Sequence, residues 1–224
     1  MTAGTSTSIA ANVAAVRARI AAACERAGRD PASVRLVAVT KTVPAAAVAE
    51  ALAAGVTDVG ENYVREGAAK RAELGGRGVW HLIGHLQTNK VRAALQAFDT
   101  LQAVDSLRLA EAVSRHASRT VPVLLEVNAA GEATKFGFAP ADVGAAAAAV
   151  RRLPDLELRG LMTVAPATSD PEALRPLFRS LRRLAEANRL QELSMGMSGD
   201  FEVAVEEGAT MVRIGRAIFG ERAR

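Results

Sequence analysis

The segment that decides the fold covers residues 192–215 and reads ELSMGMSGDFEVAVEEGATMVRIG. The runs ELSMG (192–196) and MVRIG (211–215) have the short, apolar character of buried strands. Between them, DFEVAVEEGA (200–209) has a helical pattern. A strand, a helix and a second strand in this order are typical of a parallel sheet.

The same alternation continues outward along the whole chain. Strand-like runs are predicted at 34–39, 58–60, 80–83, 100–104, 122–128, 156–163, 192–196 and 211–215, with helical patterns between them and an opening helix over residues 8–27. Eight strands alternating with helices match a (β/α)8 TIM barrel, whereas a doubly wound sheet more often has about five or six. The count includes the short run DVG (58–60), so a seven-strand alternative stays open.

Length and composition indicate a single domain over residues 1–224 with a substantial core. Half of the residues are hydrophobic, and no Pro, Ser or Gly-rich linker divides the chain. One cysteine, Cys24, excludes a disulfide framework and a CxxC metal site. No apolar run approaches about 18 residues, and the N-terminus lacks the pattern of a secretory signal. We therefore expect a cytoplasmic protein that does not contact membranes.

The charge pattern gives no support to nucleic-acid binding. The 28 basic residues exceed the 24 acidic residues by four, and both kinds are spread along the chain. No basic stripe alternates with aromatic residues, which make up only 4% of the sequence. The arginines near residue 180 are typical of the solvated face of an amphipathic helix.

The lysines are the unusual basic residues, because arginine fills the other 24 positions and only Lys41, Lys70, Lys90 and Lys135 are lysines. Arginine keeps its proton, whereas lysine can become a neutral amine and form an imine. Lys41 directly follows the apolar strand in RLVAVTKT (35–42), so it is a candidate for amine chemistry. The alternative is a strand-end lysine whose stem packs while its ammonium reaches water. Lys70 lies in a predicted helix that gives no comparable reason for a lysine.

Two loops at the ends of the last strands have the composition of an anion site. Ser198, Gly199 and Asp200 follow the seventh strand, and Arg213 and Gly215 close the eighth. Barrels frequently bind phosphate with these two loops. Alternatively, Ser198 or Asp200 is only a helix N-cap and Gly215 only a tight turn.

Together, an imine-forming lysine and a phosphate loop at one barrel mouth suit an aldehyde that carries a phosphate. Pyridoxal 5′-phosphate (PLP) is such a ligand. A Schiff-base aldolase acting on a phosphorylated sugar is the alternative from another class, and it predicts no bound chromophore.

Sequence blocks in order along nearly the whole chain carry a resemblance to a known family. They are AVTKT (38–42), GENYVRE (60–66), WHLIGHLQTNK (80–90), VDS (104–106), EVN (126–128), KFG (135–137), GLM (160–162), SMGMSGDFEVAV (194–205) and VRIGRAIFG (212–220). On these blocks the chain resembles the pyridoxal-phosphate homeostasis proteins, which are related to the barrel domain of alanine racemases.

The resemblance implies a role for eight residues. Lys41 is expected to form a Schiff base with pyridoxal 5′-phosphate. Ser198, Gly199 and Gly215 would bind its phosphate. Arg213 would lie beside its pyridine nitrogen. The pocket wall would include Asn62, His81 and Met162. An arginine opposite the ring nitrogen discourages protonation there, which weakens the ring as an electron sink.

The implied function is intracellular vitamin B6 homeostasis by a monomer that buffers the cofactor and passes it transiently to PLP-dependent apo-enzymes. The alternative is a slow PLP-dependent amino-acid racemase or lyase. Alanine racemases supply a catalytic tyrosine from a second domain, whereas this sequence has one tyrosine, Tyr63, in the GENYVRE block. A racemase needs an acid/base group on each face of the substrate carbon. We therefore expect a binding protein and not an enzyme.

Four other candidate features are weaker. His81 and His85 have HxxxH spacing, but they flank a strand end and have no third ligand in view, so no metal is expected. Asp105 and Ser106 are typical of a helix N-cap, and His116 is expected to be exposed. Lys90 and Lys135 are either surface charges or part of the family motifs, with Lys135 the better candidate for meeting incoming cofactor.

Overall fold

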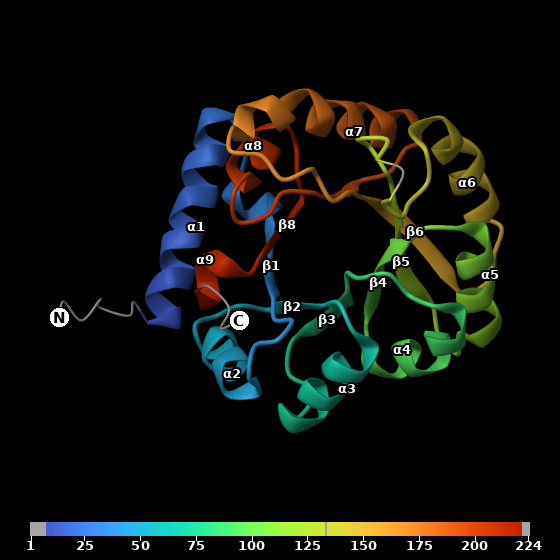
Figure 1. Ribbon diagram of the computed structural model, residues 1–224, viewed down its shortest axis with the longest axis horizontal. Coiled ribbons are helices and arrows are strands. Elements are labelled where there is room, and N and C mark those ends of the chain that lie inside the picture. The colour runs from blue at the N-terminus through green and yellow to red at the C-terminus, as the bar shows by residue number, and fades with distance from the viewer. Residues whose placement is uncertain (1–7, 133, 221–224) are drawn as a thin grey trace.

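The computed structural model describes residues 8–132 and 134–220, and its eight parallel strands form one closed barrel (Figure 1). The strands follow each other around the barrel in chain order. They are β1 (Arg35–Val39), β2 (Asp58–Glu61), β3 (Val79–Leu82), β4 (Thr100–Val104), β5 (Val121–Glu126), β6 (Leu156–Met162), β7 (Glu192–Ser194) and β8 (Met211–Ile214). The predicted TIM barrel is confirmed, and the short run DVG is a genuine strand, β2.

Helices surround the strands on the outside of the barrel (Figure 1). They are α1 (Ile9–Arg26), α2 (Ala45–Ala53), α3 (Val64–Glu73), α4 (Val91–Ala97), α5 (Leu107–His116), α6 (Val143–Val150), α7 (Arg175–Ala187), α8 (Phe201–Glu206) and α9 (Arg216–Phe219). Short 3-10 turns occur at η1 (Pro31–Ser33), η2 (Thr88–Lys90), η3 (Pro140–Asp142) and η4 (Pro171–Leu174). The extra helix α1 begins after Ser8, whose hydroxyl accepts a hydrogen bond from the Ala11 N–H, and it packs against α2, α8 and α9.

The barrel closes through the pairing of its first and last strands. Val37 lies opposite Arg213, and Ala38 lies opposite Ile214. On its other edge β1 pairs with β2, where Val39 lies opposite Gly60. Because every pair is parallel, the carboxyl ends of all eight strands meet at one mouth.

Two apolar regions hold the barrel together. The larger one lies between the strands and the helix ring and includes the fully buried side chains of Trp80, Phe98 and Phe178. The smaller one fills part of the barrel interior, and its members are Val37, Ala103, Leu124, Met162 and Met211. Cys24 is buried in α1, as expected for a packing residue. Burial of each large side chain contributes about 1.5–3 kcal/mol.

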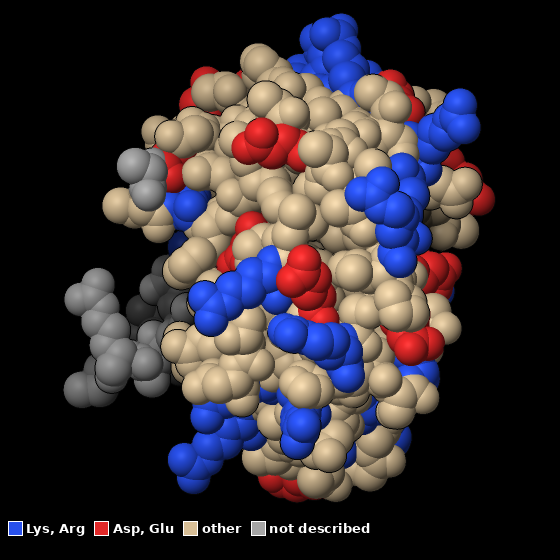
Figure 2. Space-filling view, turned by 90° about the vertical axis from the view of Figure 1, so that its right-hand side faces the viewer, with Lys and Arg blue, Asp and Glu red and all other residues tan. Residues whose placement is uncertain are grey.

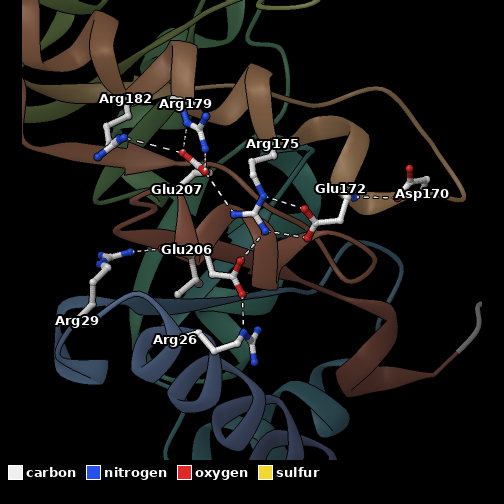
Figure 3. A network of polar contacts seen from close by, with 10 residues as sticks. Arg26, Arg29, Asp170, Glu172, Arg175, Arg179, Arg182, Glu206 and Glu207 are labelled. Carbon is white, nitrogen blue, oxygen red and sulfur yellow. Dashed lines mark hydrogen bonds and ion pairs between the residues drawn. The ribbon is translucent and has the colours of Figure 1, made fainter.

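Arginines form a network of ion pairs between α1, η4, α7 and α8 (Figure 3). Arg175 contacts Glu172 at 2.7 Å and Glu206 at 2.6 Å, and Arg26 reaches Glu206 from α1 at 2.6 Å. Glu207 accepts hydrogen bonds from Arg179 at 2.7 and 3.0 Å and from Arg175 at 3.3 Å. Planar guanidinium groups suit such shared bidentate contacts better than an ammonium group does.

On the face shown in Figure 2, basic and acidic side chains are intermixed and do not gather into a patch of one sign. Among the helices in residues 8–132 and 134–220, none is both long and apolar enough to cross a membrane.

The acceptor at the centre of the network gives a first prediction. The Glu207 side chain is only 6% exposed, and Glu207→Gln is expected to lower the free energy of unfolding by about 1–3 kcal/mol. Hydrogen bonds from Arg179, and then from Arg175, outweigh burial and lower the pKa of Glu207. The contribution of Glu207 to the free energy of unfolding is therefore present above its unfolded-state pKa of about 4.3. It is lost as the pH falls through the folded-state pKa.

Urea unfolding at neutral and acidic pH measures this effect. The matched control is Glu157→Gln, because the Arg159–Glu157 pair is exposed and is expected to contribute less than about 1 kcal/mol. Equal losses in the two variants at neutral pH would contradict a special role for Glu207.

Candidate functional site

A cavity of about 650 Å³ opens at the mouth of the barrel, within the size range of small-molecule sites. Its walls come from the loops after β1, β2, β3, β6, β7 and β8. Six of the eight residues predicted to bind the cofactor line it, and they are Lys41, Asn62, Ser198, Gly199, Arg213 and Gly215. The topology thus brings together residues up to 174 positions apart (41 to 215).

Lys41 lies in a tight turn directly after β1. The Val43 N–H donates to the Thr40 carbonyl at 2.9 Å, which closes a four-residue turn with Lys41 and Thr42 at its centre. Thr42 has a φ of +63°, in the left-handed region that favours glycine. Lys41 is half-buried and lines the cavity, so the strand-end position places its side chain at the mouth.

Two glycine-bearing loops form another wall of the cavity. The loop after β7 contains Ser198 and Gly199, and the loop after β8 contains Gly215. The Ala217 N–H donates to the Ser198 hydroxyl at 3.4 Å, which joins the two loops. A side chain at Gly215 would meet the Val39 carbonyl at 3.3 Å, so glycine lets this loop approach β1 closely.

Asp200 does not cap α8 as the N-cap alternative would require. Its carboxylate accepts a hydrogen bond from the Met197 N–H at 2.6 Å and makes no cap hydrogen bond to the helix. Asp200 therefore holds the loop that carries Ser198 and Gly199.

Arg213 lies at the cavity but is buried, with 4% of its surface exposed. Its guanidinium donates to the Ser194 hydroxyl at 2.6 Å and to the Thr163 carbonyl at 2.7 Å. Burial lowers the pKa of Arg213 to about 10, while the negative charges of Asp200 and Glu126 oppose the decrease. The group is therefore a fixed cation at neutral pH.

A chain of hydrogen bonds continues from Arg213 through the barrel interior. The Ser194 hydroxyl donates to the Gln102 side-chain oxygen at 2.6 Å. The Gln102 amide nitrogen lies 3.0 Å from His81 Nδ1, and His81 Nε2 lies 2.8 Å from the Asp58 carboxylate. With His81 protonated on Nε2, every group donates to the next one, from the cation to the carboxylate. Burial raises the pKa of Asp58, but hydrogen bonds from His81 and Thr57 outweigh it and lower the pKa overall.

His81 and Met162 differ from the expectation that they form the pocket wall, because neither is among the residues that line the cavity. His81 is fully buried and points inward to Asp58 and Gln102. Met162 belongs to the apolar cluster inside the barrel. Strand side chains alternate between inside and outside, and these two point into the interior instead of toward the mouth.

The carboxylate of Glu126, at the mouth of the barrel, was not predicted from the sequence as a site residue. Glu126 ends β5, and its Oε2 atom is buried without a hydrogen-bond partner among the described residues. Burial and the Asp105 charge raise the pKa of Glu126 to about 7, while Arg213 and His85 oppose the increase. Nearby, His85 lies 2.6 Å from the Asp105 carboxylate and stacks on Phe136 at 3.8 Å. The sequence feature that could have indicated Glu126 is the EVN block (126–128), in which a carboxylate ends an apolar strand.

The predicted helix around Lys70 is confirmed as α3, and the structure supplies the reason for a lysine that the sequence did not show. Its side chain is buried on α3 and makes ion pairs with Glu61 and Glu66. The EGAAKRAEL pattern predicts the helix, but it does not show that Lys70 packs against the carboxylate of Glu61 in β2.

The structure also shows where the remaining sequence candidates lie. Ser106 caps α5 through the Leu109 N–H, as predicted, and His116 is exposed. Lys90 is exposed, whereas the Lys135 ammonium donates to the Val164 carbonyl at 3.3 Å. In the described part of the chain, no three His, Cys, Asp or Glu residues are grouped as metal ligands.

Comparison with known proteins places this site in a family. The family model for the N-terminal domain of alanine racemase matches residues 11–223. A pyridoxal phosphate homeostasis protein from Pseudomonas aeruginosa is 50% identical over 220 residues, which cover 96% of each chain. The chain belongs to the pyridoxal phosphate homeostasis protein family.

Solved structures agree with membership of this family. PipY from Synechococcus elongatus, solved with PLP bound, has 39% identity and a TM-score of 0.82 over 95% of this chain and all of PipY. Alanine racemase from Corynebacterium glutamicum is 19% identical, with a TM-score of 0.69 over 95% of this chain and 62% of the racemase. The second similarity shows a shared fold. Homologues from Escherichia coli and Aquifex aeolicus, 44% and 42% identical, are likewise named pyridoxal phosphate homeostasis proteins.

Glu126 gives a prediction about pH. Because its pKa is raised from the unfolded value of about 4.3 to about 7, the folded protein binds the extra proton between these values, and stability falls as the pH rises through this window. Glu126→Gln removes this ionisation. The free energy of unfolding of the variant, relative to that of the wild type, is therefore expected to be about 2 kcal/mol higher at pH 8 than at pH 5.

Urea unfolding at both pH values measures the gain. Asp105, His85 and Arg213 are the same in both proteins, so the comparison isolates the carboxyl group of Glu126. Glu111→Gln, an exposed position on α5, is the control and is expected to show no pH-dependent gain. A difference between Glu126→Gln and the wild type that does not change with pH would contradict the assignment.

Proposed function

We propose that this member of the pyridoxal phosphate homeostasis family binds pyridoxal 5′-phosphate covalently through Lys41 and acts in the cytoplasm as a carrier or buffer of the cofactor. The observation that carries the proposal is that Lys41 and the loops of Ser198–Gly199 and Gly215 line one cavity. A primary amine and an anion site are the two features that a phosphorylated aldehyde requires.

The residues present fit the cofactor. Its aldehyde would meet Lys41. Its phosphate would lie against the Ser198 hydroxyl and the backbone N–H groups of Ser198, Gly199 and Gly215. In the condensation, the nitrogen of Lys41 forms a double bond to the aldehyde carbon, and the aldehyde oxygen leaves as water with the two amine hydrogens. When bound, the cofactor supplies an electron sink for amino-acid chemistry.

Arg213 would limit that chemistry. It would lie beside the pyridine nitrogen, where a fixed cation disfavours protonation of the ring. Hydrogen bonds to Ser194 and Thr163 hold the guanidinium in place, so it has little freedom to turn away. A carboxylate at this position would have the opposite effect.

The cavity also favours a carrier over a racemase or lyase. Its ionisable lining residues are Lys41, Asp200, Arg213 and Arg216. Asp200 is engaged with the Met197 N–H, and the two arginines are poor proton acceptors. Tyr63, the one tyrosine of the sequence, is 62% exposed and is not among the lining residues. Among the lining residues in the described part of the chain, Lys41 is therefore the one proton-transfer group that we assign, whereas a racemase needs one on each face.

The proposal includes a monomer that meets PLP-dependent apo-enzymes transiently. The cavity opens at the barrel mouth, where a partner could receive the cofactor on release.

The test is covalent trapping. The purified protein is mixed with pyridoxal 5′-phosphate, its visible absorption is recorded, and borohydride reduction is followed by peptide mass mapping. We expect a visible band and a reduced adduct on Lys41, both lost in Lys41→Ala and retained in Lys90→Ala, in which an exposed lysine is removed.

Two outcomes would contradict the proposal. Absence of the band, or trapping only on Lys90 or Lys135, would remove Lys41 as the anchor and leave it a strand-end lysine. Turnover of an amino acid that disappears in Lys41→Ala would replace the carrier function with that of a slow racemase or lyase.

A further inference from the structure

The turn that carries Lys41 is held on both sides by three residues of β2 and α3. We call Glu61, Glu66 and Lys70 the clamp. These side chains contact Thr40 and Thr42, the two neighbours of Lys41. They are not among the residues that line the cavity.

Lys70 makes three short hydrogen bonds with its ammonium group. It donates to the Thr40 carbonyl at 2.6 Å, to Glu61 at 2.7 Å and to Glu66 at 2.7 Å. Three acceptors match the three hydrogens of an ammonium group, which is a compact charge on a flexible stem. An arginine would bring a planar group of five donors to a buried site in which three acceptors converge on one nitrogen. This explains a lysine at position 70 in a chain in which 24 of the 28 basic residues are arginines.

Glu66 fixes the other side of the turn. Its Oε1 atom accepts the Thr42 N–H at 2.5 Å as well as the Lys70 ammonium. Thr42 holds the left-handed φ of +63°, which is costly for a residue with a branched side chain. Such a conformation persists when surrounding contacts enforce it, and Glu66 supplies that contact from α3.

Glu61 anchors the clamp to the barrel. Its side chain is fully buried in β2, and one of its oxygens accepts hydrogen bonds from both Lys70 and the Thr40 hydroxyl. The other oxygen, Oε2, has no hydrogen-bond partner among the described residues. Burial raises the pKa of Glu61, although the hydrogen bond from Lys70 opposes the increase. The cost of removing both charges from water offsets much of the attraction in a buried ion pair, so this pair is weak evidence for stability.

Tight packing keeps α3 at the right distance for these contacts. A side chain at Gly67 would come within 2.4 Å of the Phe98 ring and within 3.3 Å of the Glu61 side chain. Glycine at this position therefore lets the helix lie close to β2, so that Lys70 and Glu66 reach the turn.

We propose that Lys70 and Glu66 are positioning residues for Lys41: by holding the Thr40 carbonyl and the Thr42 N–H, they fix the turn so that the Lys41 amine faces the aldehyde of the ligand. The inference rests on the proposed function of Lys41. Its own content is that covalent capture depends on the clamp, whereas noncovalent binding of the ring and phosphate does not.

The experiment compares two clamp variants with two matched controls. Glu66→Ala removes the contact to Thr42 and leaves the buried Lys70–Glu61 pair intact, so the barrel is expected to fold. Lys70→Arg keeps the charge but not the geometry. Glu73→Ala and Lys90→Arg make the same changes at exposed positions on α3 and at the end of η2.

Three quantities are measured on each protein. Hydrogen exchange reports on the amides of residues 41–43, stopped-flow absorbance gives the rate of imine formation with pyridoxal 5′-phosphate, and titration gives the affinity for pyridoxine 5′-phosphate, which has no aldehyde. In the clamp variants we expect faster exchange at Thr42 and imine formation slower by about tenfold or more, with unchanged affinity for pyridoxine 5′-phosphate. The controls are expected to match the wild type.

The outcomes separate this inference from the proposed function. Unchanged exchange and unchanged imine formation in both clamp variants would overturn it. An equal loss of pyridoxine 5′-phosphate affinity would overturn it as well, because the clamp would then support the whole cavity and not Lys41. Failure of the wild type to form an imine would instead refute the proposed function, and the exchange data alone would then show whether the clamp holds the turn.

Discussion

The site depends on the pairing of β1 with β8. These strands are about 175 residues apart in the chain, from Arg35–Val39 to Met211–Ile214, and only the closed barrel makes them neighbours. Their parallel register places the turn of Lys41 beside the loop of Gly215, and it sets Arg213 opposite Val37. The amine of Lys41 thus meets a cation and a glycine-bearing loop that lie more than 170 positions away in the sequence (41 to 213 and 215).

The division of labour between lysine and arginine follows from the shape of each cation. Arginines join helices at the surface, where Arg175 and Arg179 share the carboxylates of η4 and α8. Arg213 is the buried exception, and its fixed partners and permanent charge suit the place beside the pyridine ring that we propose for it. At Lys70 a compact ammonium is needed, and at Lys41 we propose that a neutral amine is needed, and arginine can supply neither.

The sequence was sufficient for the fold and for most of the cavity lining, because both depend on local patterns. Apolar runs marked all eight strands, and the residues that follow strand ends included Lys41, Asn62 and Ser198. The contacts of inward-pointing side chains depend on strands that are distant in the chain. The hydrogen bonds of His81 to Asp58 and Gln102 follow from the barrel register, which no local pattern contains. The burial of Lys70 likewise depends on how α3 packs on β2.

The central claim is that one cavity joins the Lys41 amine to an anion site made by the last two βα loops. A crystal structure of the protein soaked with pyridoxal 5′-phosphate tests it most directly. The account predicts continuous density from Lys41 Nζ to the ligand, with the phosphate against Ser198, Gly199 and Gly215 and Arg213 beside the ring. Density for the phosphate at any other loop, or a ligand joined to a different lysine, would contradict it.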